Sequence, residues 1–129
     1  MQIYYFSRTG RSKKIAEELA KQHGCTERSI EDGKNWGGAF NYMKAGYYAS
    51  SGKSLPANYL PPTPDEPIAL VFPVWAGKFP PAIRTFLQEV GRTNIIAIPT
   101  SLGSTLRDRE GFLKVIDLVG KEISTPEDL

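Results

Sequence analysis

Two uninterrupted apolar runs constrain the fold of this chain more than any other feature. They are residues 68–72 (IALVF) and 94–98 (NIIAI). Short continuous runs of this kind are typical of strands that are buried on both faces, as in a parallel sheet. Between them, Pro80 and Pro81 stand at favoured first positions of a helix that apolar residues at helical spacing continue to Gly91. A strand, a helix and a second such strand predict an α/β fold with a mostly parallel sheet.

The rest of the chain continues this alternation of strands and helices. The helix at residues 12–23 is the clearest, because Ile15, Ala16, Leu19 and Ala20 share one face and Gly24 follows as a stop. Five prolines at residues 56–67 indicate an extended surface loop. We expect further helices at residues 38–51 and 108–119 and further strands at residues 3–6, 25–30 and 121–124. In the helix at 108–119 we expect these residues to be buried: Phe112, Leu113, Val115, Ile116 and Val119.

Composition excludes several classes of protein. A length of 129 residues is that of one domain, so we expect a single domain over residues 1–129. One cysteine, Cys25, excludes an internal disulfide, and a net charge of +2 with scattered basic residues argues against nucleic-acid binding. No apolar stretch is long enough to span a membrane, and the first residues lack the pattern of a signal peptide. We therefore expect a cytoplasmic location.

Three loops follow the three best strands, and each contains one glycine. In an open parallel sheet, ligands bind beyond the carboxyl ends of the strands, so these loops should meet at one edge. They are residues 7–12 (SRTGRS), 73–78 (PVWAGK) and 100–105 (TSLGST).

The first loop has the chemistry of an anion site. Ser7, Thr9 and Ser12 offer hydroxyls, Arg8 and Arg11 offer positive charge, and the helix that follows adds unpaired N–H groups. The alternative is that a hydroxyl here only caps the helix, which is common. The loop is not a Walker phosphate loop, and the chain has no Gly-x-Gly-x-x-Gly motif.

No other residues indicate catalysis or metal binding. Cys25 and His23 are isolated, zinc-ligand spacing is absent, and no side chain stands out as an acid–base catalyst, so catalytic residues are unknown. An aromatic cluster at residues 36–48 either packs in the core under the second helix or lines the ligand site.

Taken together, the three loops resemble those of the flavodoxin family. The first fits the family's phosphate signature Ser/Thr-x-Thr-Gly-x-Ser/Thr. Residues 72–87 (FPVWAGKFPPAIRTFL) look like the loop and helix after the third strand in bacterial flavodoxin-like proteins. Residues 100–104 are similar to the loop after the fourth strand.

The resemblance implies a three-layer open parallel sheet of order 2-1-3-4-5 and FMN bound at its edge. It places the FMN phosphate against Ser7, Arg8, Thr9, Gly10, Arg11 and Ser12. It places the isoalloxazine ring between Pro73, Val74, Trp75, Ala76, Gly77 and Lys78 on one side and Ser101, Leu102 and Gly103 on the other. Trp75 is the stacking candidate, against the alternative of a core tryptophan. Lys78 would raise the reduction potential if it approached the pyrimidine edge of the ring.

Three departures from the family stand out. The sequence lacks a recognisable fifth helix, so one sheet face would be partly uncovered, and a second subunit in a homodimer would bury it. The third loop offers Leu102 where an aromatic would complete a sandwich around the ring. The charge is weakly basic, whereas flavodoxins that carry electrons are usually acidic.

The predicted function is electron transfer by an FMN-binding flavodoxin-like protein. Two versions stay open: a one-electron carrier between redox proteins, and a small reductase that passes electrons from NAD(P)H to a small-molecule acceptor. The alternative is a flavodoxin-like domain that has lost flavin binding and acts as an interaction module.

Overall fold

The computed structural model describes residues 1–32, 57–127 and 129. The predicted helix at residues 38–51 and the aromatic cluster at residues 36–48 lie outside the described residues. Within them, the elements in chain order are β1 (Gln2–Tyr5), α1 (Arg11–His23), β2 (Arg28–Ser29), β3 (Ile68–Pro73), α3 (Pro81–Val90), β4 (Ile95–Ser101), β5 (Lys114–Val115) and β6 (Leu118–Val119).

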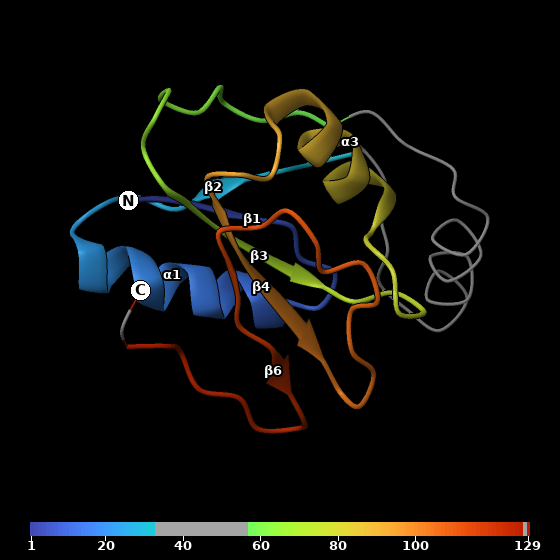
Figure 1. Cartoon of the computed structure of the whole chain (residues 1–129). Coiled ribbons are helices and arrows are strands. Elements are labelled where there is room, and N and C mark those ends of the chain that lie inside the picture. The colour runs from blue at the N-terminus through green and yellow to red at the C-terminus, as the bar shows by residue number, and fades with distance from the viewer. Residues whose placement is uncertain (33–56, 128) are drawn as a thin grey trace.

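The strands form one sheet of order β2-β1-β3-β4-β5, with β6 also paired to β4 (Figure 1). Every pairing between these strands is parallel. The predicted order 2-1-3-4-5 is therefore confirmed. The sheet's centre is β3 and β4, paired from Ile68 with Ile95 to Pro73 with Thr100.

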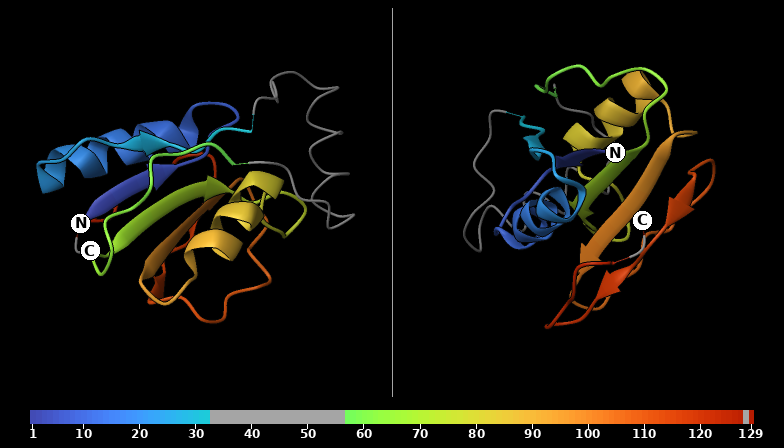
Figure 2. Two further views of the ribbon diagram at one scale, coloured as in Figure 1. Left: turned by 90° about the horizontal axis from the view of Figure 1, so that it is seen from above. Right: turned by 90° about the vertical axis from the view of Figure 1, so that its left-hand side faces the viewer.

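Two helices cover opposite faces of the sheet and complete three layers (Figure 2). On the α1 face, Ile15, Ala16, Leu19 and Ala20 pack against apolar residues of β1, β3 and β4. On the α3 face, a larger cluster includes Tyr4, Phe72 and Phe86, all fully buried. Because β3 is buried from Ile68 to Phe72 on both faces, its continuous apolar run is explained.

The two described helices end where the sequence predicts. Gly24 caps α1 in the left-handed conformation, with φ of 64°, and its N–H lies against the last carbonyls of the helix. Pro81 begins α3 and Gly91 follows its last residue. The proline-rich segment forms no regular element over residues 57–67, and one residue in it, Asn58, makes an isolated bridge to Glu31.

The predicted helix at residues 108–119 is wrong. The segment instead contributes β5 and β6, which pair with β4 through Ile96–Lys114 and Thr100–Leu118. Consequently Leu113 and Val119, expected to be buried, are 55% and 44% exposed. Without β5 and β6, the outer edge of β4 would have unpaired backbone N–H and C=O groups. Strand pairing satisfies these groups, whereas a helix at this place would not.

The predicted strand at residues 121–124 is also absent. The segment after β6 runs back along the sheet toward α1 (Figure 1). There the Thr125 hydroxyl donates to the Glu18 carboxylate of α1, and Ile123 and Leu129 pack against the α1-face cluster. No helix follows α3 in residues 91–127. An irregular segment therefore covers part of the sheet face that we expected to be left open by the lack of a fifth helix.

Candidate functional site

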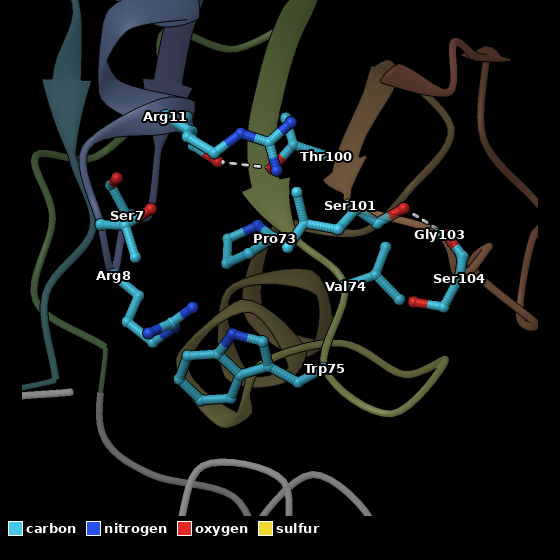
Figure 3. Close-up of a pocket in the computed structure, with 13 residues that line it drawn as sticks. Ser7, Arg8, Arg11, Pro73, Val74, Trp75, Thr100, Ser101, Gly103 and Ser104 are labelled. Atoms are coloured by element: carbon cyan, nitrogen blue, oxygen red, sulfur yellow. Dashed lines mark hydrogen bonds between the residues drawn. The ribbon is translucent and has the colours of Figure 1, made fainter. Parts of the chain in front are cut away.

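A pocket of about 330 Å³ opens at the carboxyl edge of β1, β3 and β4 (Figure 3). All three glycine-containing loops contribute to it, as the sheet topology predicts. Its size falls in the range of about 300–1,000 Å³ that is usual for small-molecule sites. The lining residues are Ser7, Arg8, Thr9, Arg11, Ser12, Pro73, Val74, Trp75, Thr100, Ser101, Leu102, Gly103 and Ser104.

The first loop supplies the polar end of the pocket. Its backbone turns at Gly10, whose φ of 96° favours glycine, and the Gly10 N–H donates to Ser7 Oγ at 2.9 Å. No side chain caps α1. The N-cap residue, Gly10, has no side chain that could accept an N–H of the first helical turn, and the hydroxyl of Ser7 accepts the N–H of Gly10 itself. Whether the loop also binds an anion stays a prediction.

The electrostatics at this end favour an anion. Arg8 and Arg11 line the pocket, and no carboxylate is among the described residues that line it. The positive end of the α1 dipole adds to their charge. Arg11 is held in place because its guanidinium donates to the Gly120 carbonyl at 2.6 Å, and the Gly120 N–H in turn donates to the Ser101 carbonyl at 2.9 Å. The segment after β6 thus connects the first and third loops.

A buried pair of hydroxyls joins α1 to β4 beneath the pocket. Ser12 Oγ and Thr100 Oγ1 lie 3.0 Å apart, and each residue is 2% exposed. Thr100 Oγ1 also lies 3.4 Å from the Phe72 carbonyl of β3. In Figure 3, Thr100 and Arg11 lie together at the end of the pocket opposite Trp75.

Trp75 belongs to both the pocket and the core. It lines the pocket with Pro73 and Val74, yet it is 5% exposed and packs edge-on against Phe6 with ring centroids 5.6 Å apart. The sequence offered two interpretations of Trp75, a ring that lines the ligand site and a ring in the core. The two are compatible, because Trp75 lies in the core and also lines the pocket. Whether a ligand stacks on this ring stays a prediction.

The residues after Trp75 form a tight turn beside the pocket. Trp75 and Lys78 exchange two backbone hydrogen bonds of 2.9 Å, with Ala76 at φ of 53° and Gly77 at φ of 76° between them. The φ of 76° favours glycine at position 77, and a Cβ there would also lie 2.8 Å from the Arg107 side chain, which would have to move. This turn fixes the direction in which Trp75 leaves β3.

The third loop lines the pocket with small or exposed side chains. Leu102 is 70% exposed at the rim, and the Ser101 hydroxyl donates to the Ser104 carbonyl. Figure 3 shows Ser101, Gly103 and Ser104 along the side opposite Ser7 and Arg8.

Most of the predicted site residues meet in this pocket, and four do not line it. These four are Gly10, Ala76, Gly77 and Lys78. The first three shape the turns, and Lys78 closes the turn after Trp75 through its backbone. Thr100 and Ser104 line the pocket but were missed. Thr100 could have been predicted, because it is the first polar residue after the apolar run of the fourth strand.

Elsewhere, the described residues show few other candidates for chemistry. No group of three His, Cys, Asp or Glu side chains could hold a metal ion in the described part of the chain. None of the helices described there is long and apolar enough to cross a membrane. Burial and the Glu89 carboxylate, 2.6 Å away, raise the pKa of the Tyr59 hydroxyl far above its usual value, so this group stays protonated.

Comparison with known proteins extends these observations to the fold. No protein-family model and no curated protein sequence matches the chain. Among the solved structures that resemble it, three are similar over most of the chain. A flavoprotein from Lactobacillus acidophilus NCFM in complex with FMN has a TM-score of 0.65 at 18% identity, covering 92% of this chain and 90% of that one.

The other two similar structures come from Bacteroides. A candidate flavoprotein from Bacteroides uniformis ATCC 8492 has a TM-score of 0.74 at 20% identity, covering 98% of this chain and 92% of that one. A candidate flavoprotein from Bacteroides eggerthii DSM 20697 has a TM-score of 0.64 at 19% identity, covering 80% and 71%. At these identities the likeness concerns the fold: the chain has the flavodoxin-like α/β fold that these proteins share.

Proposed function

We propose that the chain is an FMN-binding protein of the flavodoxin family that takes part in electron transfer. The observation that carries the proposal is the division of the pocket into two ends. Arg8, Arg11 and hydroxyls at the start of α1 lie at one end, and Pro73, Val74 and Trp75 extend to the other. A ligand that joins a phosphate to a flat apolar ring matches this division. The similar flavoprotein from Lactobacillus, which was crystallised with FMN, supports the same ligand.

The residues present fit such a ligand. Two arginines and no carboxylate are among the described residues that line the pocket, so a phosphate dianion would meet positive side-chain charge from them. The proposed phosphate contacts come from Ser7, Arg8, Thr9, Arg11 and Ser12, with Gly10 shaping the loop. The proposed ring contacts come from Val74 and Trp75 on one side and Ser101, Leu102 and Gly103 on the other. FMN would supply the redox chemistry, and the protein would bind, orient and shield it.

The proposal includes a choice between two roles that stay open. In one, the protein carries electrons between larger redox proteins. In the other, it is a small reductase that takes electrons from NAD(P)H and delivers them to a small-molecule acceptor. A homodimer and a cytoplasmic location stay predictions from the sequence.

The first experiment is a titration of the purified protein with FMN. We expect visible absorbance from bound flavin, or uptake of added FMN with quenching of its fluorescence. Arg11→Gln should weaken FMN binding by about tenfold or more, since a charged hydrogen bond contributes about 1.5–3 kcal/mol, and should change riboflavin binding little. Lys14→Gln, an exposed position one turn further along α1, is the control for loss of charge. A colourless protein that takes up no FMN would refute the proposal.

A second experiment separates carrier from reductase. Mixing the FMN-loaded protein with NADH or NADPH in a stopped-flow instrument follows the loss of flavin absorbance. Rapid bleaching by either nucleotide supports the reductase, whereas bleaching only by a reduced redox protein supports the carrier.

The exposed Leu102 favours a second candidate function. A leucine that is 70% exposed at the pocket rim, in a loop without an aromatic, suits contact with another protein better than enclosure of a ring. If the protein takes up no flavin, an interaction module is the function that this rim supports.

A further inference from the structure

A buried hydroxyl pair beneath the pocket has a feature that the binding proposal does not use. Ser12 and Thr100 are each 2% exposed, and their hydroxyl oxygens lie 3.0 Å apart across the α1–β4 contact. Each hydroxyl has one proton to donate and can accept two hydrogen bonds. Since water is largely excluded from both, the direction in which each proton points is decided by protein and ligand groups.

Two arrangements of these protons are compatible with the distances. In the first, Ser12 donates to Thr100, and Thr100 donates to the Phe72 carbonyl. In the second, Thr100 donates to Ser12, and the Ser12 proton is available to an acceptor in the pocket. The Thr100–Phe72 contact of 3.4 Å is long for an O–H···O bond, which usually measures 2.5–3.0 Å. Giving up that contact therefore costs little.

An anion in the pocket would select the second arrangement. A hydroxyl donating to a phosphate oxygen makes a charge-assisted bond, about twice as strong as a neutral one. Ser12 lines the pocket next to Arg11, and its hydroxyl can make this bond only when its own proton is not used on Thr100. A hydrogen bond received from Thr100 also polarises Ser12 and strengthens its donation.

We propose that Thr100 is a positioning residue of the anion site: its hydroxyl donates to Ser12 and thereby directs the Ser12 proton to the phosphate group of the ligand. This inference rests on the proposed binding of a flavin nucleotide. It makes β4 part of phosphate recognition, although the phosphate loop itself follows β1. It also predicts that Thr100 affects phosphate-dependent affinity without contacting the ring.

The test compares FMN with riboflavin, which has the same ring and no phosphate. Thr100→Val keeps the shape of the side chain and its suitability for a strand but removes the hydroxyl. We expect Thr100→Val to weaken FMN binding about fivefold, as expected for one hydrogen bond, and riboflavin binding less than about twofold. Thr100→Ser should restore FMN affinity because it restores the hydroxyl.

Two further variants make the result specific. Thr93→Val, at an exposed position before β4, is the matched control and should leave both affinities unchanged. In a Ser12→Ala background, Thr100→Val should have no further effect on FMN affinity, because Thr100 acts through Ser12. The ratio of the two affinities does not depend on how much of a variant is folded, since both ligands bind only the folded protein.

Each outcome has a distinct meaning. Equal weakening of FMN and riboflavin by Thr100→Val would overturn the inference in favour of a purely structural role, and an unchanged FMN affinity would overturn it outright. In both cases, FMN binding by the wild-type protein would still support the proposed function. If the wild-type protein takes up no FMN at all, the proposed function and the inference fall together.

Discussion

Two segments of the chain have apolar residues at similar helical spacing, and only one of them is a helix. Residues 11–23 form α1, whereas residues 108–119 form an irregular stretch followed by the two short strands β5 and β6. The apolar residues of α1 are all buried against the sheet. In the second segment, Leu113 and Val119 are exposed. The apolar spacing is therefore compatible with a helix in both segments. Only α1, however, packs all its apolar side chains against a face of the sheet.

Local chemistry also separates the two segments. α1 is rich in Lys, Glu and Ala, which favour helices, and its glycine stands after its end. The second segment has Gly111 inside it, at φ of 84°. Its carboxylates are also engaged elsewhere: Asp108 pairs with Arg92 through two bonds of 2.8 Å, and Asp117 pairs with Arg109.

Arg92 connects the second segment to the body of the protein through its side chain. Its guanidinium lies 5.1 Å from the centre of the Phe79 ring and 4.9 Å from that of Phe112. It also donates to the Glu110 carbonyl at 2.9 Å. The side chain thus joins the region after β4 to the aromatic cluster under α3.

The same substitution in each segment should differ greatly in its effect on stability. Leu19→Ala in α1 should reduce the free energy of unfolding by about 3 kcal/mol, because Leu19 is fully buried and its removal leaves a cavity. Leu113→Ala should change it by less than about 0.5 kcal/mol. Urea unfolding of both variants measures the contrast, and equal losses would contradict the assigned difference in burial.

Arg92→Ala should reduce the free energy of unfolding by about 2 kcal/mol. The loss combines contacts with two aromatic rings, a bidentate ion pair and the packing of the side-chain stem. Arg109→Ala, which removes an ion pair without ring contacts, is the matched comparison and should cost about 0.5 kcal/mol or less. Thermal unfolding followed by circular dichroism gives both values. Indistinguishable variants would show that the rings contribute nothing.

Gly111→Ala tests the structure of the second segment through the sign of its effect. At φ of 84°, an alanine should destabilise the protein by about 1 kcal/mol, although a Cβ there would only contact Arg92 at 3.6 Å. If the segment were helical, the same change would stabilise it by about 1 kcal/mol. Gly103→Ala, where no positive φ or close contact opposes a Cβ, is the control.

The smallest expected effect is a dependence of stability on pH. The hydrogen bonds from Arg92 hold the pKa of the Asp108 carboxyl below its usual value. A carboxyl with a depressed pKa in the folded state stabilises the protein above its unfolded pKa, near 4, and loses this contribution as pH falls further. Because Asp108 is 55% exposed, the contribution is about 0.5 kcal/mol. The difference in stability between the wild type and Asp108→Asn, measured from pH 7 to pH 2.5, should vanish at the acidic end.

Much of the site follows from sequence because its loops are short and follow strong strands. The runs at residues 68–72 and 94–98 place the second and third loops, and the helix pattern after residue 12 places the first. The pocket then follows from the parallel order of the strands. Ala76, Gly77 and Lys78, which were predicted to contact the ring, form a turn beside the pocket. Ala76 and Gly77 have positive φ values, and the Gly77 carbonyl accepts a hydrogen bond from the Arg107 N–H at 3.0 Å, a residue from a distant part of the chain.

Sequence alone was enough to predict the buried strands, the two described helices and the loop in which an anion would bind. These features depend on periodicity, on proline and glycine, and on side chains that are close together in the chain. The pairing of residues 108–119 with β4 and the contact of Thr100 with Ser12 became visible only in the folded protein. Both depend on groups that are far apart in sequence: the open edge of β4 accepts hydrogen bonds from whichever segment reaches it, and the contact of α1 with the sheet sets the 3.0 Å between the two hydroxyls.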